Sequence, residues 1–280
     1  MVFGADEFCG SVQGQTYDEA VLVRNFGSNA EGGPLLGDVF NLQGPVFAAE
    51  SGEVVFKHNE TDGASRLPSP LGAWIVLEHD NGLLSVYSRM EDTKAPLPDK
   101  IEKGALLAQA GVSGWSSGEG FSFSIFDKKE KRWVNPDIVI DTHLDDRRPP
   151  VIQSVRLRNS DGVVFDADSP RVLRQGRYSI DVQTYDLRGS AQTSQLMPHR
   201  IISSVNGIET GSLTIETFSA RDGVLMLFRG GLISANEVYG PYPLIEAGEV
   251  WLNRGSAKLE IIVQDIAGNS RSANYRLNIE

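Results

Sequence analysis

Short apolar runs separated by turn residues recur along the whole chain, and no long segment repeats its apolar residues with the 3.6-residue period of a helix. Residues 74–79 and 83–87 are two such runs, and Asp80-Asn81-Gly82 joins them. Because Asn and Gly tolerate the positive φ of a tight turn, this arrangement predicts a β-hairpin. Residues 121–125 alternate between apolar and polar, which is typical of a strand with one buried face. The nearest approach to a helix is residues 17–26, which could form at most a short one. The pattern predicts an all-β chain.

Composition narrows the range of partners. The chain has 280 residues, enough for one large domain or two of ordinary size, and a net charge of −11. Nucleic-acid binding rests on Lys and Arg that neutralise phosphates, so we expect no nucleic-acid partner. No run approaches the roughly 18 apolar residues of a membrane span, so we expect no transmembrane segment. Cys9 is the one cysteine; it leaves open an incidental thiol, intermolecular pairing or lipid attachment.

The pattern of residue types changes near residue 145, which predicts a domain boundary. Residues 145–150 are charged and end in Pro149-Pro150, so neither a helix nor a sheet continues easily across them. We therefore expect an N-terminal tail at 1–22, a first domain at 23–145 and a second at 146–280. The second domain contains seven short strand-like runs separated by turn residues, which favours an immunoglobulin-like β-sandwich. The expected runs are 151–158, 176–185, 201–205, 213–218, 224–228, 258–263 and 275–279.

Residues 25–136 resemble the lysostaphin-like (LytM-type) zinc metallopeptidase family in the order and spacing of several motifs. Residues 44–55 are similar to its "G-T-P-V-Y-A-A-A-D-G-V-V" strand pair, and residues 75–82 to "V-I-I-D-H-G-N-G". Residues 101–118 are similar to "V-x-x-G-D-x-I-A-x-x-G" followed by "G-x-T-G-x-S-T-G". Trp133-Val134-Asn135-Pro136 is similar to the closing "Y-V-N-P". The resemblance implies a LytM-type antiparallel β-sheet domain.

The histidines of the family's chemistry are replaced in this chain. The resemblance implies that active members hold zinc with His, Asp and His and leave one position open for an activated water. In the segment similar to "H-L-H-F-E-V" the two histidine positions are Gly120 and Ser122, and in "Y-x-H-L" the histidine position is Arg89. Arginine stays protonated near neutral pH and is a poor zinc ligand. We therefore expect no zinc site, no cofactor and no catalytic residue.

The family's first motif, "H-x-x-x-D", can be aligned in more than one way. The histidine position falls on Gly33, Pro34 or Leu35, and the aspartate position on Gly37, Asp38 or Val39. Asp38 is then the only possible surviving metal ligand. One carboxylate is too few for a catalytic zinc site, which takes about three protein ligands.

The four histidines, His58, His79, His143 and His199, show no metal-ligand spacing. His79 matches a family position that is not a ligand, and we expect a structural role for it. The candidate groove of the degenerate domain comprises Arg89, Trp115, Gly120, Phe121 and Ser122. Aromatic rings stack on sugars and Arg pairs with carboxylates, so the groove could still hold a glycopeptide. Phe121 could equally close it and leave a scaffold.

Two functions follow from the resemblance. The first is a non-catalytic cell-envelope protein, a pseudo-peptidase that binds peptidoglycan or scaffolds or activates an envelope protein. The second is an active peptidoglycan metalloendopeptidase with a rearranged metal site, for example Asp38 with a distant histidine. Both imply a periplasmic or otherwise extracytoplasmic location.

Overall fold

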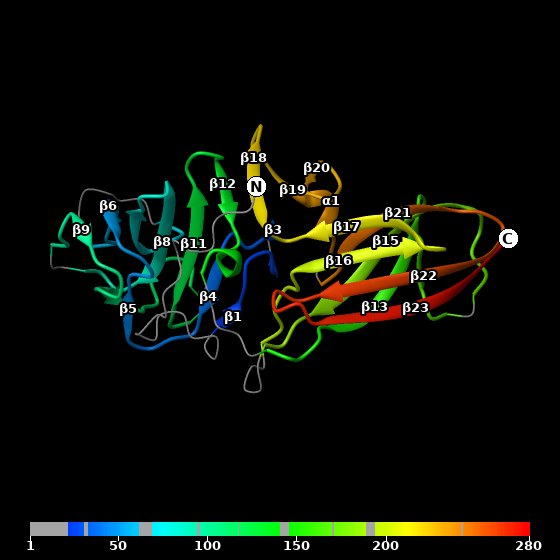
Figure 1. Cartoon of the computed structure of the whole chain (residues 1–280), viewed down its shortest axis with the longest axis horizontal. Coiled ribbons are helices and arrows are strands. Elements are labelled where there is room, and N and C mark those ends of the chain that lie inside the picture. The colour runs from blue at the N-terminus through cyan, green and yellow to red at the C-terminus, as the bar shows by residue number, and fades with distance from the viewer. Residues whose placement is uncertain are drawn as a thin grey trace. The chain divides into compact units, whose positions relative to one another are not determined.

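The chain forms two compact units. The computed structural model describes residues 22–30, 33–61, 69–93, 96–116, 118–140, 146–169, 171–188, 194–241 and 243–280 (Figure 1). Residues 1–26 and 36–143 belong to the first unit, and residues 27–35 and 144–280 to the second. Cys9, Ser117 and His143 lie outside the described residues, as does most of the expected N-terminal tail.

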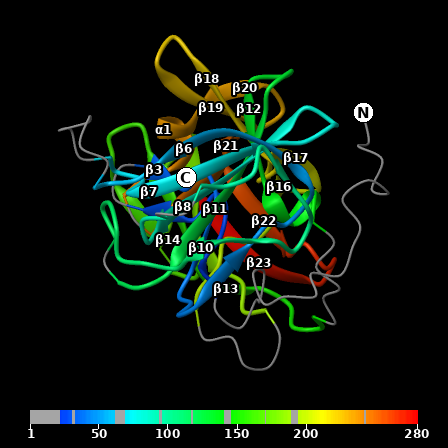
Figure 2. The ribbon, with the colours of Figure 1, turned by 90° about the vertical axis from the view of Figure 1, so that its left-hand side faces the viewer.

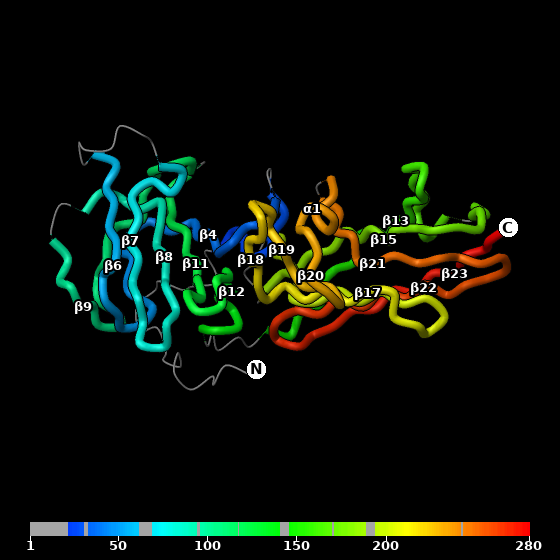
Figure 3. The backbone as a smooth tube through the Cα atoms, turned by 90° about the horizontal axis from the view of Figure 1, so that it is seen from above, coloured from blue at the N-terminus to red at the C-terminus, as the bar shows by residue number. Residues whose placement is uncertain are grey.

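An antiparallel sheet forms the centre of the first unit. Its strands follow the spatial order β12-β11-β8-β7-β6-β9, and β4 pairs with β11 and β1 with β4. Figure 3 shows β6, β7, β8 and β11 side by side. The strands are β1 (Leu22–Arg24), β4 (Asp38–Phe40), β6 (Gly52–His58), β7 (Ala73–Glu78), β8 (Leu83–Met90), β9 (Lys100–Ile101), β11 (Phe121–Asp127) and β12 (Arg132–Val134).

One face of this sheet covers the core of the first unit. Phe121, Phe123 and Ile125 in β11 are buried, whereas the residues between them are partly exposed, as the alternating sequence predicts. Tyr87 in β8 is fully buried and its ring lies 5.1 Å from that of Phe123. The smaller elements are the antiparallel pair β5 (Pro45–Phe47) and β10 (Leu106–Gln109), and the 3₁₀ helix η2 (Pro136–Ile138).

Two four-stranded antiparallel sheets form most of the second unit. Their spatial orders are β14-β13-β15-β21 and β17-β16-β22-β23, and Figure 2 shows β16, β22 and β23 as neighbours. A Cβ on Gly211 in β17 would lie 2.1 Å from the carbonyl oxygen of Ala247 in β21, so glycine permits the two sheets to approach closely here. The strands are β13 (Val151–Asn159), β14 (Val164–Asp166), β15 (Gly176–Tyr185), β16 (Arg200–Val205), β17 (Ile208–Thr214), β21 (Ile245–Leu252), β22 (Gly255–Gln264) and β23 (Ser270–Ile279).

The remaining elements of the second unit lie around Tyr239. They are the hairpin β2 (Asn29–Ala30) and β3 (Gly33–Pro34), the meander β18 (Thr217–Arg221), β19 (Val224–Phe228) and β20 (Leu232–Ser234), and the one-turn helix α1 (Ala235–Val238). The Tyr239 hydroxyl donates a 2.8 Å hydrogen bond to the carbonyl oxygen of Gly27. This buried bond connects the early segment 27–35 to residues more than 200 positions later.

The all-β prediction is confirmed, and so is the hairpin formed by β7 and β8. Residues 18–20, where at most a short helix was expected, lie outside the described residues, and Leu22–Arg24 form strand β1, which pairs with β4. One local expectation was wrong. The expected strand at 213–218 is interrupted: β17 ends at Thr214 and β18 begins at Thr217, while the Ile215 amide bonds the His199 carbonyl and its side chain is buried. No helix in the described part of the chain has the length and apolarity to cross a membrane.

Candidate functional site

A row of directly paired residues crosses four strands of the first unit. Arg24 in β1 pairs with Val39 in β4, Val39 pairs with Ser122 in β11, and Ser122 pairs with Ser88 in β8. Directly opposite residues of antiparallel strands project to the same face of a sheet. The row therefore places Ser122, a histidine position of the family motif, on the same face as Val39 and Arg24.

Asp38 lies on the other face of the same strands. It pairs with Phe123, which in turn pairs with Tyr87, and all three side chains are buried. The Asp38 carboxylate is 0% exposed and accepts a 2.7 Å hydrogen bond from the Phe26 backbone amide. The structure thus separates Asp38 from Ser122 and gives the carboxylate a bond that anchors the start of the domain.

The backbone at Gly120 leaves no room for a side chain. Its φ is +155°, and a Cβ there would lie 2.0 Å from the carbonyl oxygen of Phe40. Real Cβ atoms are essentially never found so close to a backbone oxygen, so a histidine at position 120 would require the β4 backbone to move. The Gly120 amide and carbonyl both bond Gly111 across the adjoining loop, which fixes this approach.

Ser122 carries a buried hydroxyl. Its Oγ is inaccessible to solvent and has no hydrogen-bond partner in the structure as described. A buried hydroxyl without a partner loses its bonds to water and gains none in return. Position 122 therefore has a small polar group that neither supports the fold nor offers an exposed nucleophile.

Arg89 projects into the site because of a β-bulge. Ala73 pairs with Met90 and Ile75 pairs with Tyr87, so two residues of β8 lie opposite one residue of β7. Arg89 is one of these two, and its φ is +65°. A bulge re-aims a side chain that regular alternation would direct to the opposite face. The half-buried Arg89 therefore reaches the same side of the sheet as Arg24.

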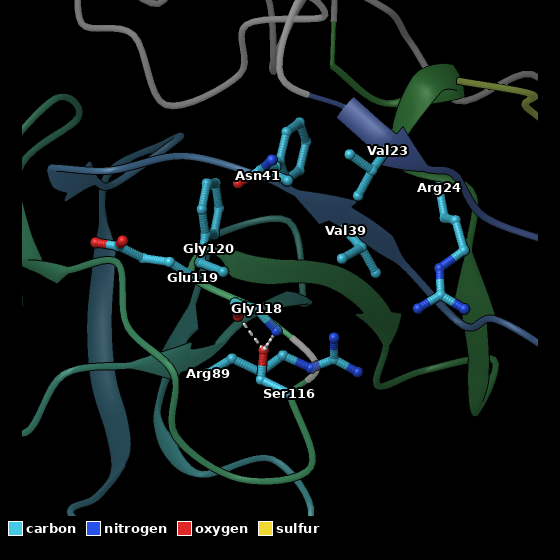
Figure 4. Close-up of a pocket in the computed structure, with 11 residues that line it drawn as sticks. Val23, Arg24, Val39, Asn41, Arg89, Ser116, Gly118, Glu119 and Gly120 are labelled. Carbon is cyan, nitrogen blue, oxygen red and sulfur yellow. Dashed lines mark hydrogen bonds between the residues drawn. The ribbon is translucent and has the colours of Figure 1, made fainter. Parts of the chain in front are cut away.

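These residues surround a pocket of about 190 Å³ (Figure 4). Arg24, Val39 and Arg89 line it together with the loop that precedes β11. Three residues of the expected groove line it, Arg89, Gly120 and Phe121, and Val39 was named only as a possible aspartate position. The other lining residues were not expected: Val23, Arg24, Phe40, Asn41, Ser116, Gly118 and Glu119.

The two aromatic residues of the expected groove differ in their surroundings. Phe121 is buried and its ring stacks on that of Phe40 at 4.8 Å, with an angle of 11° between the planes. Its faces are therefore largely occupied within the protein. Trp115 is 75% exposed and does not line the pocket, although it lies in the same loop as Ser116. Of the two, Trp115 is the ring that a ligand can reach.

His79 and Tyr87 are held by hydrogen bonds within the first unit. His79 Nδ1 lies 2.8 Å from the Ser51 carbonyl oxygen and Nε2 lies 2.8 Å from Ser85 Oγ, and burial lowers the pKa of the ring. The Tyr87 hydroxyl accepts a hydrogen bond from the Ala49 amide, and burial raises its pKa to about 12. Both side chains connect the hairpin to the strand pair before it, which is a structural task.

Three side chains that could bind a metal ion lie close together in the second unit. Among the described residues, the one group of three side chains close enough to share a metal ion is Asp146, Asp186 and Asp265, whose carboxylate oxygens lie within 4.8 Å of one another. Burial raises the pKa of Asp186 to about 7, and Arg188 lies 3.7 Å from the same carboxylate.

Comparisons with known proteins bear on each part of the chain. The family model of peptidase family M23 matches residues 38–136, and a second family model, which carries no description, matches residues 149–280. None of the curated proteins matches the chain.

Several solved structures are similar to part of the chain. One is the catalytic domain of a point mutant of EnpA, a prophage-encoded M23 protein from Enterococcus faecalis, at 22% identity over 46% of this chain and 97% of that one, with a TM-score of 0.37. Another is the catalytic domain of the antimicrobial peptidase lysostaphin from Staphylococcus simulans, at 22% identity over 38% and 78%, with a TM-score of 0.31. A third belongs to the SpoIIQ–SpoIIIAH pore-forming complex, at 21% identity over 43% and 83%, with a TM-score of 0.34. At these TM-scores the likenesses support no argument about function.

The family match coincides with the sheet that carries the pocket. It begins at Asp38, the first residue of β4, and ends at Pro136, just after β12. Residues 38–136 form an M23, lysostaphin-like peptidase domain, and a C-terminal domain of antiparallel β-sheets follows it.

Proposed function

We propose that this protein is a non-catalytic M23-type protein of the cell envelope, a pseudo-peptidase that binds peptidoglycan through the pocket face of its first unit. The observation that carries the proposal is the set of side chains on that face. Where the family resemblance implies histidines, the chain has Arg89, Gly120 and Ser122. Val39, rather than Asp38, is the direct cross-strand partner of Ser122.

This set of residues does not fit a zinc ion. A catalytic zinc takes about three nitrogen, sulfur or carboxylate ligands. Val39 and Gly120 supply no side-chain ligand, and Ser122 supplies a neutral hydroxyl. Arg89 adds a permanent positive charge that would oppose a cation in the pocket. No step of hydrolysis is therefore assigned to this site.

The backbone gives independent support for loss of catalysis. A side chain at position 120 meets the Phe40 carbonyl, so restoring the histidine takes more than one substitution. The bulge at Arg89 similarly directs a cation, and not a neutral base, into the pocket.

Retention of peptidoglycan binding is supported by the family and by the open pocket. M23 peptidases act on peptidoglycan and are generally extracytoplasmic. The exposed Trp115 offers a flat face of the kind that stacks on sugar rings. An envelope protein as the partner is the competing outcome. A division into domains at 23–145 and 146–280, with an immunoglobulin-like second domain acting as a spacer, forms part of the same proposal.

Co-sedimentation of the purified protein with isolated sacculi tests the proposal. We expect the protein to pellet with sacculi and Trp115→Ala to weaken retention. Trp251→Ala is the matched control, because Trp251 is also well exposed, at 61%, but lies in the second unit. Metal analysis and release of peptides from sacculi are measured on the same preparation.

Three results would contradict the proposal. Failure of the protein to pellet, with an envelope protein captured from extract instead, would favour a scaffold for a protein partner. Equal loss of retention in both tryptophan variants would remove the pocket face from the argument. Stoichiometric zinc together with released peptides would establish the rearranged metalloendopeptidase.

A further inference from the structure

Two arginine side chains enter the pocket from different strands. Arg24 comes from β1 and Arg89 from the bulge of β8, and both line the pocket. In Figure 4 their guanidinium groups extend into the same region, on the side of the pocket away from Glu119. Burial and, after it, the nearby charge of Arg24 lower the pKa of Arg89.

Neither guanidinium has an acidic partner in the part of the chain that the structure describes. Among the lining residues, Glu119 carries a carboxylate. Its Oε2 accepts a 2.7 Å hydrogen bond from Gln43 Nε2, and the side chain points away from the arginines (Figure 4). Burial is the main cause of the lowered pKa of Arg89, and the charge of Arg24 adds to it. Two like charges held together at a partly buried place cost free energy unless an anion compensates them.

The size of the pocket limits what such an anion can be. Ligand pockets for whole small molecules measure roughly 300–1,000 Å³, whereas this one is about 190 Å³. It therefore accommodates one small group at the end of a larger molecule. Two planar guanidinium forks match the geometry of a group with two or three anionic oxygens, which they bind with short, charge-assisted hydrogen bonds.

We infer that Arg24 and Arg89 together form a binding site for a single oxyanion group, a carboxylate or a phosphate, at the end of a larger ligand. This inference deepens the proposed function and rests on it for the identity of the ligand, since a free carboxylate of a peptidoglycan peptide would supply the group. The site occupies the place where the family resemblance implies a cation and its catalytic histidine. Two arginines at this place favour negative charge, whereas a zinc site would require ligands for a cation.

Titration of the full-length protein with small probes tests this site. The probes are N-acetyl-alanyl-alanine, the same dipeptide with its C-terminus amidated, and inorganic phosphate, each followed by NMR or calorimetry at low salt. The variants are Arg24→Gln and Arg89→Asn. Asparagine tolerates positive φ well, so Arg89→Asn removes the charge without straining the bulge. Arg254→Gln removes an exposed charge of the second unit and serves as the control.

We expect the free acid to bind at least tenfold more tightly than the amide, because a charge-assisted hydrogen bond is worth roughly a factor of ten or more. Arg24→Gln and Arg89→Asn should each weaken binding by about tenfold or more, and Arg254→Gln should leave it unchanged. If phosphate binds instead of the dipeptide, and its binding depends on both arginines in the same way, the oxyanion site is supported and the group that it binds is a phosphate. Absence of binding by both anions, or equal binding by all variants, overturns the inference.

The sacculus assay separates this inference from the proposed function. If sacculi retain the wild type and both arginine variants equally and no probe binds, the inference fails while the proposed function stands. If the probes bind as expected and sacculi retain nothing, the site stands and the proposed function fails. Thermal unfolding of each variant shows that a loss of binding is not a loss of fold.

Discussion

Replacing Ser122 by Ala should stabilise the first unit, an unusual direction for a substitution at a partly buried position of a sheet. The Ser122 hydroxyl is buried and has no hydrogen-bond partner among the described residues. In the unfolded chain the same hydroxyl bonds water. Folding therefore costs the desolvation of one hydroxyl, and alanine avoids that cost.

The magnitude follows from two opposing effects. An unsatisfied buried hydroxyl costs about 1–3 kcal/mol. The cavity left by one oxygen atom reduces this gain in stability by only a few tenths of a kcal/mol, at roughly 24 cal/mol per Å³. The free energy of unfolding should thus rise by about 1 kcal/mol or more, which corresponds to a Tm increase of roughly 4 °C for a domain of this size.

Ser85→Ala is the matched control. Ser85 is also fully buried, but its Oγ lies 2.8 Å from His79 Nε2, so its removal takes away a buried hydrogen bond. That loss should lower stability by about 1–3 kcal/mol. Calorimetry and urea unfolding of the full chain compare the two variants. If Ser122→Ala lowers the Tm as Ser85→Ala does, the Ser122 hydroxyl has a partner in solution and the reasoning is refuted.

Three further predictions concern the second unit. Gly211→Ala should lower the free energy of unfolding by about 1–3 kcal/mol, because its Cβ would meet a carbonyl oxygen of the facing sheet. Gly231→Ala, with open space around it, should change this free energy little. Urea unfolding compares the two variants, and equal effects would contradict the close approach of the sheets. Tyr239→Phe should cost about 1–3 kcal/mol by leaving the Gly27 carbonyl unpaired, and a thermal unfolding temperature equal to that of the wild type would count against the bond. Burial raises the pKa of Asp186 from its ordinary 3.8 to about 7, so the folded unit binds a proton that the unfolded chain releases; the stability from this group is complete below about pH 4 and is lost as pH rises through 7. Asp186→Asn should flatten that decline in urea unfolding between pH 4 and 8, and an unchanged slope would assign the decline to other groups.

The sequence predicted much of the fold because strand patterns are local. The alternation in residues 121–125 and the Asn81-Gly82 turn each fix an element without reference to the rest of the chain. The structural role of His79 was predicted from its place in the hairpin, and its two hydrogen bonds agree with it.

The site was harder to predict because it depends on pairing between distant strands. Arg24 lines the pocket because β1 pairs with β4, and no local sequence pattern predicts the register of these two strands. The face that Asp38 occupies is decided in the same way, since a shift of one residue moves a side chain across the sheet. Arg89 was identified by its motif, but its direction follows from a bulge that the motif does not encode.

The assignment of residues 27–35 to the second unit has a consequence for folding during synthesis. This segment leaves the ribosome long before Tyr239, the residue whose hydroxyl bonds Gly27. The M23 domain can complete its own sheet in the interval, while the hairpin of β2 and β3 has to wait for more than 200 residues of further chain. The second unit is therefore completed from two separated stretches of the chain, and a fragment that begins at residue 144 lacks part of it.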